Sequence, residues 1–422
     1  MARAKGRDDR DDAEVQALIS SFDPFRDPYL SDPYPFFSEA RRIAPVFHSP
    51  RLDYWIVTRH RDVREVLQNW HEYSASNTLD TLKPLCPHAR EALEHGGFRP
   101  VKALTNADPP AHTRVRRLAN AAFTPRRVAL MEPFIRRLAS HFFEERLSAG
   151  KADLVREFAW ELPALVVFNI IGVPDEDVPW VKTGTGSRIL FNWGYPSDEE
   201  QTGLARESAT FWSYAEALVA ERMREPRDDF TSDLIRARDG DDQPLTAREI
   251  TTVLFSLLTA GHETTTSLLG NAFRWLLADR AAWQALCADA ALIPNAVEEV
   301  LRYGPPVFSW RRRTLRPVYI DGVKLPEGAN ILAMIGSANR DAEVFRDPER
   351  FDIRRTNAKE HVSFGHGCHI CLGAPLARLE ARVVIEELCR RLPGLRLAPG
   401  QRFRYPPNTS FRGPLELMVE WD

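Results

Sequence analysis

The segment from Phe364 to Gly373, FGHGCHICLG, brings together four side chains that can bind a metal: His366, Cys368, His369 and Cys371. Cysteine thiolates and histidine imidazoles are the ligands of structural zinc and of haem iron, and cysteine pairs carry thiol redox chemistry. The segment therefore predicts a metal or redox centre, and its spacing allows three kinds of site.

Two of these kinds are disfavoured by the rest of the chain. A thioredoxin-like pair has the C-x-x-C spacing of Cys368 and Cys371, but it needs a preceding strand and a parallel sheet around it, and this chain is helical here. A zinc site usually takes four ligands from two separated pairs, and the sequence offers no second Cys/His pair at suitable spacing. Both remain alternatives that explain few of the residues.

A haem loop, the third kind, also accounts for the glycines. Gly365 and Gly367 allow a tight turn close to a flat macrocycle, since neither has a Cβ, and Gly373 allows close helix packing beyond the loop. Cys371 would lie where the loop enters a helix predicted over residues 375–391. The partial positive charge of that helix N-terminus favours a thiolate by roughly 0.3–1 kcal/mol.

These residues resemble a known signature. Phe364-Gly365-x-Gly367-x-His369-x-Cys371-x-Gly373 is similar to the haem-binding signature of the cytochrome P450 family at every fixed position. The resemblance implies haem b (iron protoporphyrin IX) with Cys371 as the iron ligand and His369 at a haem propionate. It further implies that Phe364, Gly365 and Gly373 contact the cofactor, and that Cys368 is only a small packed residue.

The long apolar helix predicted over 246–277 contains residues that a purely structural helix would avoid. Gly261 costs roughly 1 kcal/mol in a helix interior, and Glu263 places a carboxylate on an apolar face. Ala260-Gly261-His262-Glu263-Thr264-Thr265 resembles the oxygen-binding helix of the same family. The resemblance implies a catalytic site at Ala260 and Gly261, where Gly261 opens a groove beside the iron, and proton delivery by Thr264 with Glu263.

A third pattern implies a structural ion pair. Glu299 and Arg302 lie three apart, on one helix face. Without further context a surface pair of little energetic value would be favoured. The family resemblance instead implies a buried Glu-x-x-Arg pair that is completed by Arg350, from Pro348-Glu349-Arg350-Phe351, and that holds the cysteine loop without doing chemistry.

A fourth pattern consists of basic residues that could bind the carboxylates of a haem. The segment from Asp108 to Arg116 resembles the family segment in which His112 and Arg116 contact propionates, and their spacing of four places both on one helix face. Arg312 resembles a further propionate ligand, although its neighbours Arg311 and Arg313 leave this register open by one residue.

The elements that position these motifs are mainly helical. Val46, Phe47 and 54–57 are strand candidates, the Asp321-Gly322 turn predicts a hairpin within 314–332, and short strands are expected from Leu395 onward. Besides a short one from Val63, helices are predicted over residues 110–123, 125–148, 154–171, 205–223, 246–277, 280–288, 293–303 and 375–391. We expect a mainly α protein with small β-sheets: one large domain over 21–422, preceded by a disordered tail over 1–20.

Composition excludes several classes of function. The chain has 422 residues and a formal net charge of −3, which gives no reason to expect binding to nucleic acid or to an anionic membrane. The longest apolar run, 250–260, is too short to span a bilayer, no signal peptide opens the sequence, and five scattered cysteines are no disulfide framework. We expect a cytoplasmic monomer.

The resemblance implies a monooxygenase that hydroxylates or O/N-dealkylates a small, largely apolar substrate, aromatic compounds included. Electrons from NAD(P)H would come through a ferredoxin and reductase, or through a fused reductase; the two sources are equally expected. The predicted substrate pocket includes Leu258, Val307, Phe308, Phe191 and Ser410, without a charged anchor. A peroxide-driven haem-thiolate enzyme and a haem sensor are the alternatives, and the Glu263–Thr264 pair counts against both.

Overall fold

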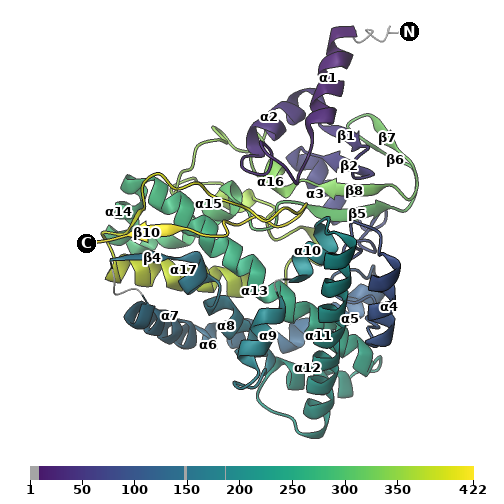
Figure 1. The fold of residues 1–422 in the computed structure, drawn as a ribbon, viewed down its shortest axis with the longest axis vertical. Coiled ribbons are helices and arrows are strands. Elements are labelled where there is room, and N and C mark those ends of the chain that lie inside the picture. Colours follow the sequence, from purple (N-terminus) through teal and green to yellow (C-terminus); the bar gives the residue numbers. More distant parts are fainter. Residues whose placement is uncertain (1–8, 147–149, 186) are drawn as a thin grey trace.

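Helix α13 (Ala247–Ala278) crosses the middle of the molecule, with most other helices around it (Figure 1). The computed structural model describes residues 9–146, 150–185 and 187–422. A capping box starts α13: Thr246 Oγ1 accepts from the Glu249 N–H at 3.1 Å, while the Thr246 N–H donates to the Glu249 carboxylate at 2.8 Å. This start agrees with the helix predicted over 246–277.

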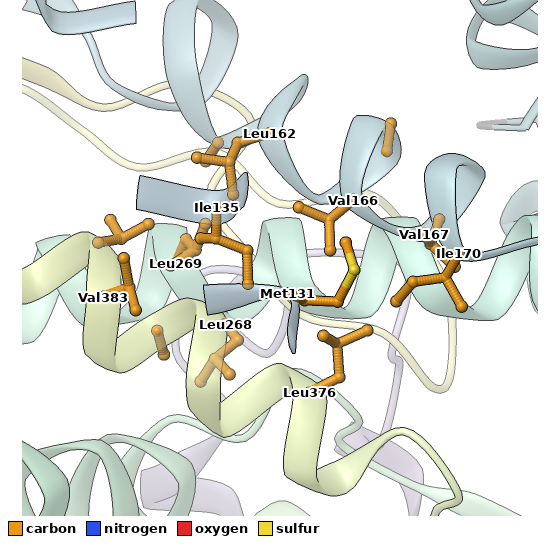
Figure 2. Packing of buried hydrophobic residues seen from close by; sticks show 14 of the residues in the cluster. Met131, Ile135, Leu162, Val166, Val167, Ile170, Leu268, Leu269, Leu376 and Val383 are labelled. Atoms are coloured by element: carbon orange, nitrogen blue, oxygen red, sulfur yellow. The ribbon is translucent and has the colours of Figure 1, made fainter. Parts of the chain in front are cut away.

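The apolar faces of four helices meet in the core around α13 (Figure 2). They belong to α7 (Glu132–Arg146), α8 (Leu162–Ile171), α13 and α17 (Ala374–Arg391). Figure 2 labels Ile135 of α7, Leu162 and Val166 of α8, Leu269 of α13 and Val383 of α17. Burying one such side chain stabilises the fold by roughly 1.5–3 kcal/mol. This packing fixes α13 and α17, which carry two of the sequence motifs, relative to each other.

Some of the other helices were predicted, whereas those over residues 34–43, 178–185, 187–193, 230–239 and 335–338 were not. In chain order, the other helices are α2 (Tyr34–Ile43), α3 (His60–Gln68), α4 (Pro87–His95), α5 (Ala111–Ala122), α6 (Pro125–Leu130), α9 (Val178–Thr185), α10 (Ser187–Trp193), α11 (Asp198–Arg224), α12 (Phe230–Asp239), α14 (Arg280–Ala288), α15 (Ile293–Tyr303) and α16 (Ile335–Ala338). Shorter turns are the π-helix η1 (Val155–Ala159) and the 3-10 turns η2 (Ala290–Leu292), η3 (Ala358–Glu360) and η4 (Gly367–His369).

Several predicted helices differ at their boundaries. The helix predicted over 125–148 is divided into α6 and α7 at Met131, and the one over 154–171 begins as η1 before α8. Helix α11 starts before the predicted residue 205, because Ser197 and Glu200 form a capping box there. Polar caps thus extend one helix beyond its apolar pattern.

The small sheets lie mainly beside the N-terminal segment (Figure 1). The larger has the order β1-β2-β8-β5-β3, with β2 parallel to β8 and the other neighbours antiparallel. Its strands are β1 (Val46–Ser49), β2 (Tyr54–Val57), β3 (Tyr73–Ser74), β5 (Trp310–Thr314) and β8 (Asn330–Ala333). The second contains β4 (Lys151–Asp153), β9 (Arg396–Leu397) and β10 (Met418–Glu420), and the predicted hairpin is β6 (Val318–Ile320) with β7 (Val323–Leu325). The mainly α class with small sheets is confirmed.

The N-terminal segment differs from the predicted disordered tail. Residues 1–8 lie outside the described residues, but α1 (Asp9–Ser21) is a helix. Its side chains Val15, Leu18 and Ile19 pack on a core cluster that contains Phe22 and Phe37. Apolar residues at helical spacing therefore order the part from residue 9 onward, which the charged start of the sequence obscured. No helix among the described residues is long and apolar enough to cross a membrane.

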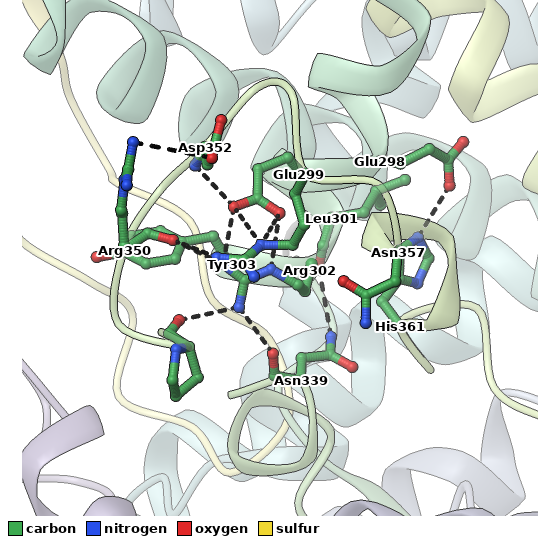
Figure 3. Close-up of polar contacts among 12 residues, drawn as sticks. Glu298, Glu299, Leu301, Arg302, Tyr303, Asn339, Arg350, Asp352, Asn357 and His361 are labelled. Carbon is green, nitrogen blue, oxygen red and sulfur yellow. Dashed lines mark hydrogen bonds and ion pairs between the residues drawn. The ribbon is translucent and has the colours of Figure 1, made fainter. Parts of the chain in front are cut away.

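A buried ion pair fixes the chain that leads to the cysteine loop (Figure 3). Arg302 binds the Glu299 carboxylate through two nitrogens, at 2.7 and 2.8 Å, and both side chains are fully buried. Arg302 also donates to the carbonyls of Asn339, Pro348 and Arg350 at 2.9 to 3.1 Å. The pair therefore clamps α15 to the coil between residues 339 and 350.

The prediction that the Arg350 side chain completes the Glu299–Arg302 pair was wrong. The Arg350 side chain is 71% exposed and reaches toward Asp352 in Figure 3, away from Glu299, so only the carbonyl of this residue takes part. Arg355 binds Glu299 instead, with Nε 3.2 Å from the carboxylate and a side chain 8% exposed. The coil turns back on itself after Arg350, since Arg355 also donates to the Asp347 carbonyl at 3.1 Å. Sequence distance alone did not reveal this reversal.

We expect Arg355→Ala to lower the free energy of unfolding by on the order of 3 kcal/mol, because it removes a cation from a buried carboxylate. Arg350→Ala is the matched control from the same coil and should change that free energy by less than about 0.5 kcal/mol. Urea-induced unfolding followed by circular dichroism measures both. Equal effects of the two substitutions would contradict the assignment of Arg355.

Candidate active site

Cys371 lies between η4 and the N-terminus of α17, at the wall of a cavity. Its N–H donates to the Phe364 carbonyl at 2.8 Å, and this bond closes the loop. Burial raises the pKa of the Cys371 thiol, while hydrogen bonds from the Gly373 and Ala374 N–H groups and the nearby Arg116 lower it. The sulfur is enclosed by protein but open to the cavity, so it can reach a group bound there. A bound metal would keep it deprotonated.

The two glycines of the loop have different reasons to be glycine. Both Gly365 and Gly367 have φ of +75°, which disfavours any side chain. A Cβ on Gly367 would lie 2.8 Å from Gln68 Cα, so the loop packs directly on the end of α3 there. Gly365 faces the cavity instead. Only Gly365 thus has the predicted place beside a bound group, and Gly367 docks the loop on the fold.

The cavity has a volume of about 270 Å³ and collects most of the sequence motifs. Its walls come from the cysteine loop, the start of α17, the middle of α13, α10 and the segment around Pro306. Lining residues that the sequence singled out are Arg116, Ala260, Gly261, Glu263, Thr264, Val307, Arg312, Phe364, Gly365, His369, Cys371 and Gly373. Motifs far apart in the chain therefore line one cavity.

On α13, two faces have different tasks. A Cβ on Gly261 would lie 2.5 Å from Val167 Cγ2, so this glycine allows α8 to pack closely on α13. That differs from the expected groove beside the iron, although the Gly261 backbone does line the cavity. Thr264 Oγ1 donates to the Ala260 carbonyl at 2.7 Å, a bond within the helix that leaves its oxygen lone pairs free to accept.

Glu263 is a buried carboxyl group that faces the cavity. Its side chain is 8% exposed, and Oε1 has no hydrogen-bond partner among the described residues. Burial alone raises its pKa from 4.5 to about 8, so the group is mostly protonated at neutral pH. An acid held in this state beside Thr264 can give a proton to a site in the cavity.

A second buried acid, Glu380 of α17, was not singled out by the sequence. It also lines the cavity, and its Oε2 lacks a partner within the described part of the chain. Burial raises its pKa well above the usual range. The only pattern that could have indicated it is a single carboxylate on the buried face of the predicted helix 375–391.

The side chains of His112, His369 and Arg312 lie close together beside the cysteine loop. The rings of His112 and His369 lie 4.1 Å apart, and Arg312 is close enough to lower the pKa of both. Burial is the larger cause, giving a pKa of about 4 for His112 and about 3 for His369. Both His112 nitrogens and His369 Nε2 are buried without a partner in the described structure.

These unpaired donors fit the carboxylates of a haem. Buried polar groups without a partner are costly, and an anionic ligand would satisfy them. Arg116 lines the same space, and its Nη1 donates to the Ile370 carbonyl at 2.6 Å, beside Cys371. The residues present therefore suit an apolar, flat group with acidic substituents near these donors and a metal at the sulfur.

The register of the arginine triplet follows from the strand. Arg312 points into the cavity. Arg311 is buried elsewhere, donating to the carbonyls of Asp80 and Asn192 at 2.6 and 3.0 Å. Arg313 donates to Asn330 Oδ1 at 3.1 Å and is partly exposed. Alternation along β5 selects Arg312, the residue that the family resemblance named.

A metal cluster without haem is disfavoured by the same geometry. Ligand atoms of His112, Cys368 and His369 lie within 4.8 Å of one another, the one such group found among the described residues. It offers three ligands, and Arg312 is near enough to lower the pKa of Cys368. A neighbouring positive charge opposes binding of a second cation.

Of the five residues predicted for the substrate pocket, Val307 lines the cavity and four do not. Phe308 packs on Tyr34 and Phe37, with ring centroids 5.8 and 5.7 Å away. Adjacent residues of an extended chain point to opposite sides, so Val307 and Phe308 cannot both face the cavity. The prediction was wrong for Phe308 because it ignored this alternation.

The other three errors have related causes. Leu258 lies in the main core, whereas Leu257 faces the cavity, one residue or about 100° around the helix. Ser410 is buried against Ser309, with the hydroxyl oxygens 3.3 Å apart, and the next residue, Phe411, lines the cavity. Phe191 packs in a cluster with α4. Periodic patterns located these segments, but not the side of each that faces the cavity.

Comparisons with known proteins agree with this architecture. A sequence model described as Cytochrome P450 matches residues 208–393. The chain is 36% identical over 403 residues to the cytochrome P450 monooxygenase PikC of Streptomyces venezuelae, covering 93% of this chain and 92% of that protein. It is equally 36% identical over 407 residues to the mycinamicin IV hydroxylase/epoxidase of Micromonospora griseorubida, covering 94% and 98%.

Solved structures are similar over nearly the whole chain. Cytochrome P450 CREJ in complex with (4-ethylphenyl) dihydrogen phosphate has a TM-score of 0.92 and 38% identity, covering 96% of this chain and all of that one (100%). Full-length CYP116B46 from Tepidiphilus thermophilus has a TM-score of 0.93 and 39% identity, covering 97% of this chain but 54% of that one. An intact type IV self-sufficient cytochrome P450 monooxygenase has a TM-score of 0.93 and 38% identity, covering 96% of this chain but 53% of that one. With the fold, the cysteine loop and these relatives together, the chain belongs to the cytochrome P450 family of haem-dependent monooxygenases.

Proposed function

We propose that this chain inserts one oxygen atom of O2 into a small, largely apolar, aromatic substrate, by hydroxylation or by O- or N-dealkylation, with Cys371 as the haem ligand. One observation carries the proposal: the cavity that Cys371 faces is also lined by Glu263 and Thr264 of α13. The haem supplies the activation of O2 when it is bound. The protein residues bind, orient and deliver protons.

Residues of the cysteine loop, of α5 and of β5 hold the cofactor in this proposal. Cys371 supplies the thiolate, with the Gly373 and Ala374 N–H groups opposing the effect of burial on its pKa. In this proposal His369, Arg116 and Arg312, which line the cavity, bind the propionates together with His112, whose ring lies 4.1 Å from that of His369.

Glu263 and Thr264 deliver protons. Cleavage of O2 at a buried site consumes protons, and an alcohol with an acid behind it can relay them from solvent. Glu263 is held mostly protonated, and the Thr264 hydroxyl is fixed by its bond to the Ala260 carbonyl. Thr264 therefore presents an accepting oxygen to the cavity, next to a proton donor.

Electrons come from NAD(P)H through separate ferredoxin and reductase proteins or through a reductase in the same polypeptide. The chain is similar to proteins of both lengths: it covers all of the CREJ chain (100%) but about half of the type IV self-sufficient monooxygenase (53%). The similarity to the self-sufficient monooxygenase supports a reductase in the same polypeptide, whereas the similarity to CREJ concerns a chain of this length alone and does not distinguish the two sources.

The aromatic character of the substrate is supported by the cavity and by one neighbour. Trp193, Trp310 and Phe411 line the cavity, and flat side chains of this kind pack well on aromatic rings. The CREJ structure contains (4-ethylphenyl) dihydrogen phosphate, a compound with one benzene ring. A compound of similar size suits the same position here.

The first test is the absorption spectrum of the reduced protein under carbon monoxide. We expect the strongly red-shifted Soret band of a thiolate-ligated haem, abolished by Cys371→Ala because that substitution removes the ligand. Cys368→Ala, three residues away, is the matched control and should leave the band in place. A band at the position typical of histidine ligation in the parent protein would contradict the proposal.

Proton delivery is tested by Thr264→Ala. With NADPH and a surrogate ferredoxin and reductase, this variant should release about tenfold more hydrogen peroxide per NADPH consumed, since O2 is reduced without productive protonation. Thr251→Ala is the control, because Thr251 Oγ1 makes the same bond within α13, to the Ala247 carbonyl at 3.0 Å, outside the cavity lining. Unchanged peroxide release by Thr264→Ala would remove this role.

Glu263 also predicts how stability depends on pH. Its folded-state pKa is raised from 4.5 to about 8, so its contribution to stability is complete below pH 4.5 and is lost as the pH rises through about 8. Glu263→Gln should therefore match the parent at pH 5 and exceed its melting temperature at pH 9. Thermal unfolding of the haem-loaded proteins measures this, with Glu216→Gln on the exposed face of α11 as the control. A variant that is less stable at pH 9 would contradict the burial of an uncompensated acid.

A further inference from the structure

Arg188 of α10 lines the cavity, and it is not one of the predicted cofactor ligands. Its Nη1 donates to the Phe255 carbonyl and to Thr259 Oγ1, each at 3.3 Å. The guanidinium carbon lies 4.2 Å from the centre of the Phe255 ring. These contacts fix the guanidinium against α13, at the level of Phe255 and Thr259.

The Arg188 guanidinium has no anionic partner among the described residues. Within the described residues no carboxylate lies within 4.0 Å of it, and burial is the single cause that lowers the pKa of Arg188 to about 10. Glu263 lines the same cavity, but neither group contributes to the pKa shift of the other. A guanidinium removed from water with only neutral acceptors is costly, and an anion beside it would offset that cost.

The other arginines at this cavity are used differently. Arg116 and Arg312 lie beside the cysteine loop and lower the pKa values of the histidines there. Arg188 causes no such effect on His112 or His369. Its charge is therefore separate from the cluster that suits the haem carboxylates, which leaves it available to another ligand.

A purely structural use of Arg188 would be to tie α10 to α13. Two bonds to neutral acceptors from one nitrogen serve that purpose, and a glutamine could make them as well. Nε and Nη2 have no protein acceptor among the described residues. Arg188 has five N–H donors, so most of its hydrogen-bonding capacity is not used by its bonds to α13.

We propose that Arg188 binds the acidic group of the substrate, so that the substrates are small aromatic acids with a carboxylate or a phosphate monoester at one end. This inference rests on the proposed function, because it concerns the same cavity. Ser256, which follows Phe255 in α13, lines the cavity and adds a hydroxyl donor for such an oxyanion, whereas the Thr259 hydroxyl already donates to the Phe255 carbonyl. Trp193, Val307 and Phe411 supply the apolar wall for the ring.

The spacing along α13 suits a substrate of one ring. Thr259 accepts a hydrogen bond from the Arg188 guanidinium, and Thr264 is the residue proposed to deliver protons. The two threonines are five residues apart on α13. This separation is about 7.5 Å along the helix axis. A benzene ring with an acid at one end and a reactive alkyl or alkoxy group in the para position spans a comparable length. The anion would then direct oxidation to the far end.

Calorimetric titration of the haem-loaded protein tests the proposal with three probes: 4-ethylbenzoate, 4-ethylphenyl phosphate and the neutral 4-ethylbenzamide. The parent should bind at least one anion about tenfold more tightly than the amide, and the two anionic probes show which oxyanion is preferred. Arg188→Gln should lose that preference and keep its affinity for the amide within about twofold. Arg188→Lys should keep part of the preference, because it retains the charge.

Arg224→Gln, at an exposed position near the end of α11, is the control for a general effect of charge and should leave all three affinities unchanged. Equal affinity of the parent for acid and amide overturns the proposal, as does an equal loss of both by Arg188→Gln or a lysine variant without any preference. The carbon monoxide spectrum is measured on the same samples. A thiolate-type band without an anion preference refutes the role of Arg188 alone, whereas loss of that band in the parent refutes the proposed function.

Discussion

The structure depends on presenting one cysteine sulfur to a buried cavity. Burial raises the pKa of the Cys371 thiol, so by itself the fold opposes the thiolate that the chemistry requires. The N-terminus of α17 answers this with two N–H groups, and the Phe364 carbonyl holds the backbone of Cys371 at 2.8 Å. The loop can do this only because Gly367 docks on α3 and the Glu299–Arg302 pair anchors the preceding coil. Much of the packing therefore serves the direction of one side chain.

The cavity also gathers polar groups that an ordinary core would exclude. His369, Glu263 and Glu380 line it, His112 packs on His369, and each of the four has a buried atom without a partner among the described residues. Each such atom costs free energy when it is desolvated, and their number in one place is unusual for a packed interior. Binding a group with complementary acceptors at the histidines would reduce this cost. Stability of the fold and occupancy of the cavity should therefore be coupled.

Much of the fold and part of the site could be predicted from the sequence. Motifs with fixed spacing located Cys371, His369, Glu263 and Thr264, since each depends on contacts within one loop or one helix. Arg355 was missed because a coil that reverses direction has no periodic pattern. Leu257 and Phe411 were missed in favour of a neighbouring residue, because the side of an element that faces the cavity is decided by packing against distant segments. Arg188 was missed since a single charge carries no pattern.

Helix α13 shows how far unusual residues indicate function. Gly261, Glu263 and the adjoining threonines all conflict with a simple apolar helix, and such conflicts are expected at functional sites. The structure divides them by direction. Gly261 admits Val167 of α8, and Thr266 Oγ1 donates to the Ala159 carbonyl at 2.9 Å, so these two serve packing against α8 and η1. Glu263 and Thr264 face the cavity. Two of these four residues, Gly261 and Thr266, are thus structural. The close approach of α8 fixes the rotation of α13 about its axis, and that rotation directs the side chains of Glu263 and Thr264 toward the cavity.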